Sequence, residues 1–142
     1  MKPTYEEMLT ANCVWTWQHQ GIWYKLSWHG YANDCMPEGI WCWYITLRRN
    51  QFSAETWETL RILNDDGSVD YWEFPDVGAH GGWTYGKLEK DDHGNELLTV
   101  GCDYNHLWDH ELYWPHDKTR VEAEARAAID KFLQLYPVEA QS

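Results

Sequence analysis

Several features that would assign a chain to a function class are missing from this sequence of 142 residues. No apolar run approaches the roughly 18 residues of a membrane-spanning helix, and the start, MKPTYEEMLT, lacks the apolar centre of a signal peptide. The four cysteines form no CxxC pair, which argues against a zinc site built of thiolates. We therefore expect a cytoplasmic protein with no membrane partner, whose cysteines are reduced and mostly buried.

Basic side chains are scarce. Only 11 lysines and arginines stand against 23 aspartates and glutamates, which gives a net charge of -12. This charge repels phosphate backbones and argues against direct nucleic-acid binding. It permits the opposite role, in which an acidic, DNA-like surface occupies the basic groove of a host protein and inhibits it. Solubility alone would also account for it.

Aromatic residues, in contrast, are abundant, with 11 tryptophans and 9 tyrosines. Such side chains suit cores, interfaces and stacking pockets alike, because each has an apolar body and a polar tip. A chain of this size needs only a few tryptophans for its core. We expect some rings to line a concave surface or a subunit interface, with a symmetric homodimer as the default.

The hydrophobic pattern predicts a single α+β domain over residues 1–142, with an antiparallel sheet of about five or six strands and helices packed on it. Strands are predicted in a hairpin over residues 14–28 that turns near Gln20 and Gly21, at 40–47, at 69–74, and in a second hairpin with strands 82–88 and 96–102 around a turn at 90–95. Helices are predicted at residues 4–11, at 53–63 with Ser53 as the N-cap, and at 117–136. The last is amphipathic: its apolar stripe should pack on the sheet, with Glu122, Arg126 and Asp130 facing solvent.

Groups able to do chemistry gather at one end of the second hairpin. Pairing about its turn should set His80 beside Asp103 and Tyr104, and His106 and Asp109 follow closely. We therefore predict a ligand site formed by His80, Gly81, Gly82, Trp83, Asp103, Tyr104, His106, Trp108 and Asp109.

This cluster supports three chemical roles. His80, Asp103 and His106 would suit zinc or iron, as in a small metal-dependent hydrolase. Without metal, Asp103 would orient a histidine as general base. Alternatively, the carboxylates cap a turn and the histidines are polar surface groups. Cys102 is a weak candidate for a nucleophile, because strand alternation points it away from Asp103.

The rings near this cluster favour a planar ligand. A nucleobase would stack between two of them, with Asp103 or Asn105 reading its edge. An anionic ligand would also need a local positive patch, for which Arg48, Arg49, Lys87 and Arg120 are the candidates.

The segment HGGWTYG, followed after a turn by VGCDYNHLWDH and an amphipathic helix, resembles a family of small bacteriophage and prophage proteins of unknown function. Their motif is HGGxTY…GxDxxHxxD, and the likeness covers roughly residues 76–136. The matching positions are His80, Gly81, Gly82, Thr84, Gly101, Asp103, His106 and Asp109, whereas Trp83 and the Tyr104-Asn105 pair depart from the family pattern.

The resemblance implies a viral accessory protein that acts in the host cytoplasm, with host defences as one target. The first functional prediction is thus an anti-defence protein that sequesters a small, nucleotide-like ligand. The acidic inhibitor and the small hydrolase are the alternatives.

Overall fold

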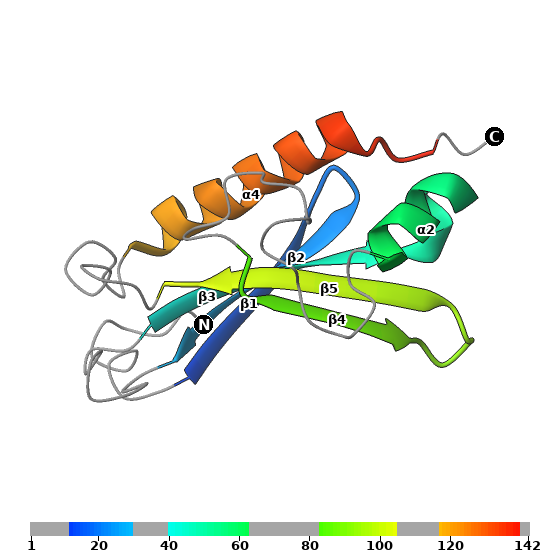
Figure 1. The fold of residues 1–142 in the computed structure, drawn as a ribbon. Helices are drawn as coiled ribbons and strands as arrows, with labels where there is room; N and C mark the ends of the chain where they lie inside the picture. The colour runs from blue at the N-terminus through cyan, green and yellow to red at the C-terminus, as the bar shows by residue number, and fades with distance from the viewer. Residues whose placement is uncertain (1–11, 30–39, 63–82, 105–116, 140–142) are drawn as a thin grey trace.

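The computed structural model describes residues 12–29, 40–62, 83–104 and 117–139. They form one antiparallel sheet of five strands in the order β1-β2-β3-β5-β4, with a long helix lying across one face (Figure 1). The strands are β1 (Asn12–His19), β2 (Ile22–His29), β3 (Ile40–Arg48), β4 (Tyr85–Lys90) and β5 (Glu96–Asp103). The helices are α2 (Ala54–Ile62), α4 (Lys118–Leu135) and the short 3-10 helix η1 (Arg49–Gln51). The predicted α+β class is confirmed. The predicted helix at 4–11 and strand at 69–74 lie outside the described residues.

The β1–β2 hairpin turns where the sequence predicts. Gln20 and Gly21 both have positive φ angles, 52° and 79°, which is the backbone of the tight turns that match the twist of paired strands. His19 therefore pairs with Ile22, and the ladder continues to Asn12 opposite His29. The apolar run predicted as a central strand is β3, which lies in the middle of the sheet.

The second hairpin is shifted relative to its prediction. Its first strand begins at Tyr85 and runs to Lys90, because the turn closes at Asp91 and not at Lys90. The Asp91 carboxylate accepts hydrogen bonds from the backbone N–H groups of His93 and Asn95, each at 2.9 Å. Gly94 supplies the positive φ, 81°, that returns the chain into β5.

The core lies between the sheet and α4. Trp28, Trp41 and Trp43 are fully buried on this face of the sheet, and the predicted apolar stripe of α4 packs against them. The buried residues of α4 are Val121, Ala125, Ala128, Ile129 and Phe132. Neither described helix is long and apolar enough to cross a membrane.

The polar flank of α4 does not simply face solvent, contrary to the prediction. The Tyr24 hydroxyl donates to Glu122 at 2.6 Å and accepts from Arg126 at 3.0 Å. His19, at the β1–β2 turn, contacts the Asp130 carboxylate at 2.7 Å. These side chains anchor the helix to β2 and to the end of β1, because the helix crosses the sheet close enough for long side chains to reach it.

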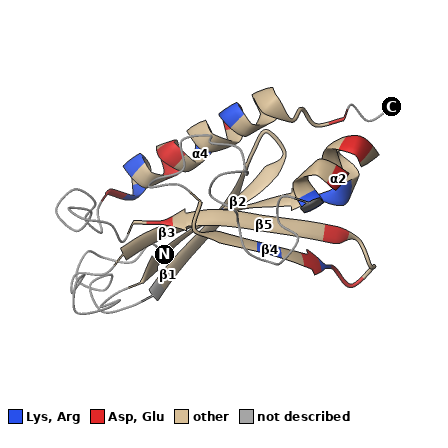
Figure 2. Ribbon diagram, viewed as in Figure 1, with Lys and Arg blue, Asp and Glu red and all other residues tan. Residues whose placement is uncertain are grey.

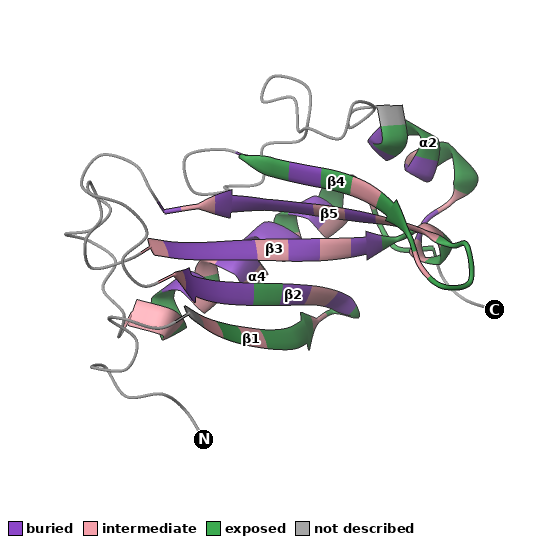
Figure 3. Ribbon diagram, turned by 90° about the horizontal axis from the view of Figure 1, so that it is seen from below, coloured by how far each residue is buried: buried purple, intermediate pink, exposed green. Residues whose placement is uncertain are grey.

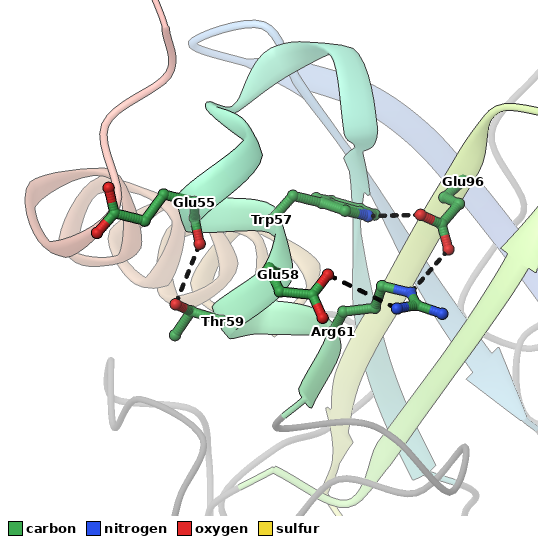
Figure 4. A network of polar contacts seen from close by, with 6 residues as sticks. All are labelled: Glu55, Trp57, Glu58, Thr59, Arg61 and Glu96. Atoms are coloured by element: carbon green, nitrogen blue, oxygen red, sulfur yellow. Dashed lines mark hydrogen bonds and ion pairs between the residues drawn. The ribbon is translucent and has the colours of Figure 1, made fainter.

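The shorter helix, α2, begins as predicted. The Ser53 hydroxyl accepts a hydrogen bond from the Thr56 N–H at 3.1 Å and so caps it. Figure 4 shows how α2 is fixed to β5: the Trp57 indole and the Arg61 guanidinium both donate to Glu96, at 3.1 and 3.0 Å. The bend between β3 and α2 is thereby held at the far end of the sheet from Asp103.

Candidate functional site

The sheet has a second face, opposite α4, which we call the open face because neither described helix covers it. Figure 3 looks onto it, with α4 behind the strands. Strand alternation brings Val14, Lys25, Ser27, Cys42, Tyr44, Tyr85, Thr99 and Asp103 to this side. The mixture of titratable, hydroxyl and aromatic side chains makes this face the candidate site.

A shallow hollow of about 230 Å³ lies on the open face. All five strands contribute to it, through Val14, Lys25, Ser27, His29, Tyr44, Tyr85 and Thr99. The register explains the grouping: Val14 lies opposite Ser27, Lys25 lies opposite Tyr44, and Gly101 lies between Tyr44 and Tyr85. The hollow is therefore built from rigid strand positions and not from a single loop.

One wall consists of two tyrosine rings. Tyr44 and Tyr85 meet edge to face, with ring centroids 5.2 Å apart and an interplanar angle of 79°. Gly101 makes this arrangement possible. A Cβ at that position would lie 2.5 Å from Cδ1 of Tyr44 and would also overlap the carbonyl oxygen of Trp43. The Tyr44 ring thus occupies the space that any larger residue at 101 would fill.

Lys25 brings a positive charge into the hollow. Its amine lies 5.1 Å from the centroid of the Tyr44 ring, within cation–π range. No carboxylate of the described residues lies at ion-pair distance from it. By contrast Lys87, one of the predicted sources of positive charge, is paired with Glu89 at 2.8 Å. Lys25 was missed in the sequence, where it reads only as a polar residue on an alternating strand.

The other side of the hollow is polar. The Ser27 hydroxyl lies 3.1 Å from Nε2 of His29, and both groups line the hollow. Cys42 lies opposite Ser27 in the β2–β3 ladder and on the same face as Tyr44. Burial raises the pKa of the Cys42 thiol to about 11, and the nearby charge of Asp103 adds to the effect, although the neighbouring Tyr44 and Ser27 hydroxyls oppose it. The thiol is therefore protonated at neutral pH and is a poor nucleophile.

The same burial keeps Tyr44 in its neutral form. Desolvation is the main cause of its raised pKa, and the Cys42, Tyr85 and Asp103 groups raise the pKa further. Tyr44 therefore presents an uncharged phenol and ring to whatever enters the hollow. Among the described groups that line it, Lys25 is the one lysine or arginine, and no aspartate or glutamate is included.

The described members of the predicted site do not converge. Asp103 lies on the open face, where it pairs with Cys42 of β3. Trp83 and Tyr104 are 2% and 1% exposed in the core on the opposite side of the sheet. The extended pairing reaches past the predicted end of the strand, since the Tyr104 N–H donates to the Trp41 carbonyl at 2.8 Å. Neighbouring residues Asp103 and Tyr104 consequently point to opposite faces.

Both core aromatics have defined partners. The Trp83 ring meets Trp43 edge-on, with centroids 5.7 Å apart. The Tyr104 hydroxyl donates to Glu124 at 2.9 Å and accepts from the Trp43 indole at 3.1 Å. In this arrangement, Trp83 and Tyr104 therefore do not reach a ligand on the open face.

The remaining predicted ligand residues, His80, Gly81, Gly82, His106, Trp108 and Asp109, lie outside the described residues. The predicted zinc or iron site depends on two of them and stays a prediction. Among the residues that are described, no group of three or more His, Cys, Asp or Glu side chains is placed to hold a metal ion.

Comparison of the chain with protein-family models, with curated proteins and with solved structures gives no match.

Proposed function

We propose that this protein binds a small, planar, anionic molecule of the nucleotide type in the hollow of the open face. The observation that carries the proposal is the position of Lys25, a cation without a described carboxylate partner, beside the Tyr44–Tyr85 ring wall and the Ser27–His29 pair. Pockets that enclose a drug-sized ligand measure about 300–1,000 Å³. The hollow, at about 230 Å³, therefore suits one ring, with the rest of the ligand lying along the open face.

Each lining group has a role in such binding. Tyr85 is 41% exposed and offers an accessible ring surface, so a base can stack on it. Lys25 would pair with the phosphate, and an ion pair at a partly enclosed site is stronger than one in free solvent. The Ser27 and His29 groups can both donate and accept hydrogen bonds, which suits the mixed polar edge of a base.

Most of the net negative charge belongs to residues outside the described ranges. The described residues include 12 acidic and 10 basic side chains, a net charge of -2, whereas the whole chain has -12. Figure 2 shows that acidic and basic residues are interspersed along α4 and on β4. The described residues are thus close to neutral in sum, and Lys25 supplies a positive charge at the hollow.

The proposed biological role is sequestration. The likeness of the HGGWTYG…GCDYNHLWD segment to bacteriophage proteins supports a viral accessory protein that acts in the cytoplasm of the host. Removal of a nucleotide signal by stoichiometric binding would serve anti-defence activity without chemical turnover. This role requires no metal and no nucleophile, in keeping with the protonated Cys42 thiol.

Isothermal titration calorimetry with AMP, GMP, CMP and UMP, and with the corresponding nucleosides, tests the proposal. At least one nucleotide should bind, its nucleoside should bind more weakly, and added salt should reduce the difference. Lys25→Met should remove most of the advantage of the nucleotide over the nucleoside, and Tyr85→Ala should weaken both. Lys90→Met is the matched control, because Lys90 is exposed at the end of β4 and strand alternation places it on the face opposite the hollow. Absence of binding by all eight compounds, or equal loss in Lys90→Met, would refute the proposal.

The acidic-inhibitor alternative depends on a different part of the chain. Residues outside the described ranges carry -10 of the net charge of -12, because they include 11 acidic residues and one basic residue, Lys2. This concentration favours the alternative as a second candidate. Salt-sensitive binding of a basic host protein, unaffected by Lys25→Met, would support inhibition in place of ligand sequestration.

A further inference from the structure

We propose that two copies of this chain pair edge to edge through β1, antiparallel about a two-fold axis, so that their sheets join into one. This inference is independent of the proposed ligand. It follows from the contrast between the two edge strands, from the exposed apolar side chains of β1, and from the placement of charge.

The two edges of the described sheet are β1 and β4. An edge strand offers unpaired backbone N–H and C=O groups, because hydrogen bonding alternates between its two sides. Proteins protect such edges with charged side chains. β4 (YGKLEK) contains Lys87, Glu89 and Lys90, whereas β1 (NCVWTWQH) contains no Lys, Arg, Asp or Glu. β1 is therefore the edge without charged protection.

Exposed apolar side chains accompany this edge. Val14 is 59% exposed on the open face, and Trp17 is 63% exposed on the face shared with α4. They are two of the five large hydrophobic side chains that are exposed in the described part of the chain. Figure 3 shows β1 as the outer strand of the sheet, with exposed and intermediate positions along it. A strand added here would cover apolar surface on both faces at once.

A second copy of the chain is the occupant that fits best. β1 pairs with itself without opposing like charges, because it contains none. With Thr16 on the two-fold axis, the faces of the two sheets match: Trp15 lies opposite the partner's Trp17, and Val14 lies opposite the partner's Gln18. Each exposed apolar side chain of β1 thus gains a neighbour from the other copy.

The described charges near this edge are compatible with the pairing. β1 contains no Lys, Arg, Asp or Glu, and the adjacent strand β2 contains Lys25 alone. The pairing therefore brings no carboxylate of either strand against a carboxylate of the other copy's β1 or β2.

The pairing would also affect the hollow. Val14 forms the outer rim of the hollow on β1, so in the Thr16-centred register the partner's Gln18 lies next to that rim. The open faces of the two copies would be continuous across the axis.

Sedimentation equilibrium and native mass spectrometry of the full chain test this inference. A dimer of the 16.9 kDa chain is expected. Gln18→Lys places a charge on the exposed edge, and each dimer would contain this charge twice. The dissociation constant of the dimer should therefore rise by about tenfold or more. Trp17→Ser should also weaken the dimer. Thr119→Lys adds the same charge at an exposed position of α4 and is the matched control.

Hydrogen exchange provides a second readout that does not depend on the variants. Amide protection in residues 14–18 of the native protein should increase with protein concentration, and protection in β4 should not. A monomer at every concentration would refute the inference. A dimer that survives both β1 substitutions unchanged, or that Thr119→Lys weakens equally, would place the interface elsewhere and refute it as well.

Discussion

Replacement of Tyr104 by phenylalanine tests a buried polar contact of the described structure. The Tyr104 hydroxyl accepts from the Trp43 indole at 3.1 Å and donates to Glu124 at 2.9 Å. Trp43 is 0% exposed, so its N–H would lose its acceptor without access to water. An unsatisfied buried donor costs about 1–3 kcal/mol. Glu124 is partly exposed and can be hydrated, so we expect a total loss of about 2 kcal/mol.

Urea unfolding followed by tryptophan fluorescence measures this loss. With an unfolding slope of about 2 kcal/mol per molar urea, the midpoint should fall by about 1 M. The melting temperature should fall by about 4–8 °C. Binding of AMP at the open face should not change, because Tyr104 lies on the other side of the sheet.

Tyr85→Phe is the control for Tyr104→Phe. It also removes one phenol hydroxyl, but from a side chain that is 41% exposed, and its stability should stay within about 0.5 kcal/mol of the parent. A loss below about 0.5 kcal/mol in Tyr104→Phe would mean that the indole finds another partner or that the Trp43–Tyr104–Glu124 chain of hydrogen bonds contributes little.

Three further outcomes are expected. Gly101→Ala should destabilise the fold by about 1–3 kcal/mol in the same urea assay and weaken nucleotide binding, because its Cβ would displace the Tyr44 ring; unchanged affinity would separate that ring from the site. Cys42, with a pKa raised to about 11 by burial, should resist iodoacetamide at neutral pH in the native protein, as peptide mapping would show; rapid labelling there would contradict this environment. Burial alone would raise the pKa of Glu122, but the hydrogen bond from Tyr24 and two basic neighbours outweigh it and lower the pKa below the usual 4.5. The stability that ionised Glu122 contributes is fully present above about pH 4.5 and is lost as the pH falls through its folded-state pKa. The urea midpoint of the parent should therefore drop more steeply in acid than that of Glu122→Gln, and parallel curves would contradict this role of Glu122.

Elements with a strong local signal were predicted well. The paired positive φ angles at Gln20 and Gly21 need residues that tolerate them, and the sequence places a glycine there between alternating strands. The apolar stripe of α4 repeats at helical spacing, so the buried face follows from periodicity alone. The Ser53 cap is likewise a contact over three residues. In each case the information lies within a few residues of the feature.

The start of β4 and the end of β5 were harder to predict. Trp83 and Thr84 continue the aromatic and β-branched pattern of a strand, yet the ladder begins at Tyr85. A displacement of one residue in a strand reverses which face each side chain occupies. The prediction ended the strand before Asp103 and so grouped Asp103 with Tyr104, which the alternation of the longer strand separates.

The hollow could not be predicted from local pattern, because its members come from five strands. Lys25 and Tyr44 are neighbours only through the β2–β3 register, and Tyr44 and Tyr85 only through Gly101 of β5. Nothing in the sequence near Lys25 distinguishes it from a solvated lysine. Its significance depends on the ring beside it and on the absence of a described carboxylate partner, and both are properties of the assembled sheet.

The motif positions and the hollow nevertheless meet on the same face. Gly101 and Asp103 are two residues apart on β5, so both belong to the open face. Gly101 makes room for the Tyr44 ring, and Asp103 adds to the field that keeps Cys42 and Tyr44 protonated. These two motif residues thus affect the position and the protonation of Tyr44, whereas Lys25 and Tyr85 are the groups that the proposed ligand would contact. Substitution of Gly101 should therefore change binding through the position of Tyr44, and substitution of Lys25 should change it through charge.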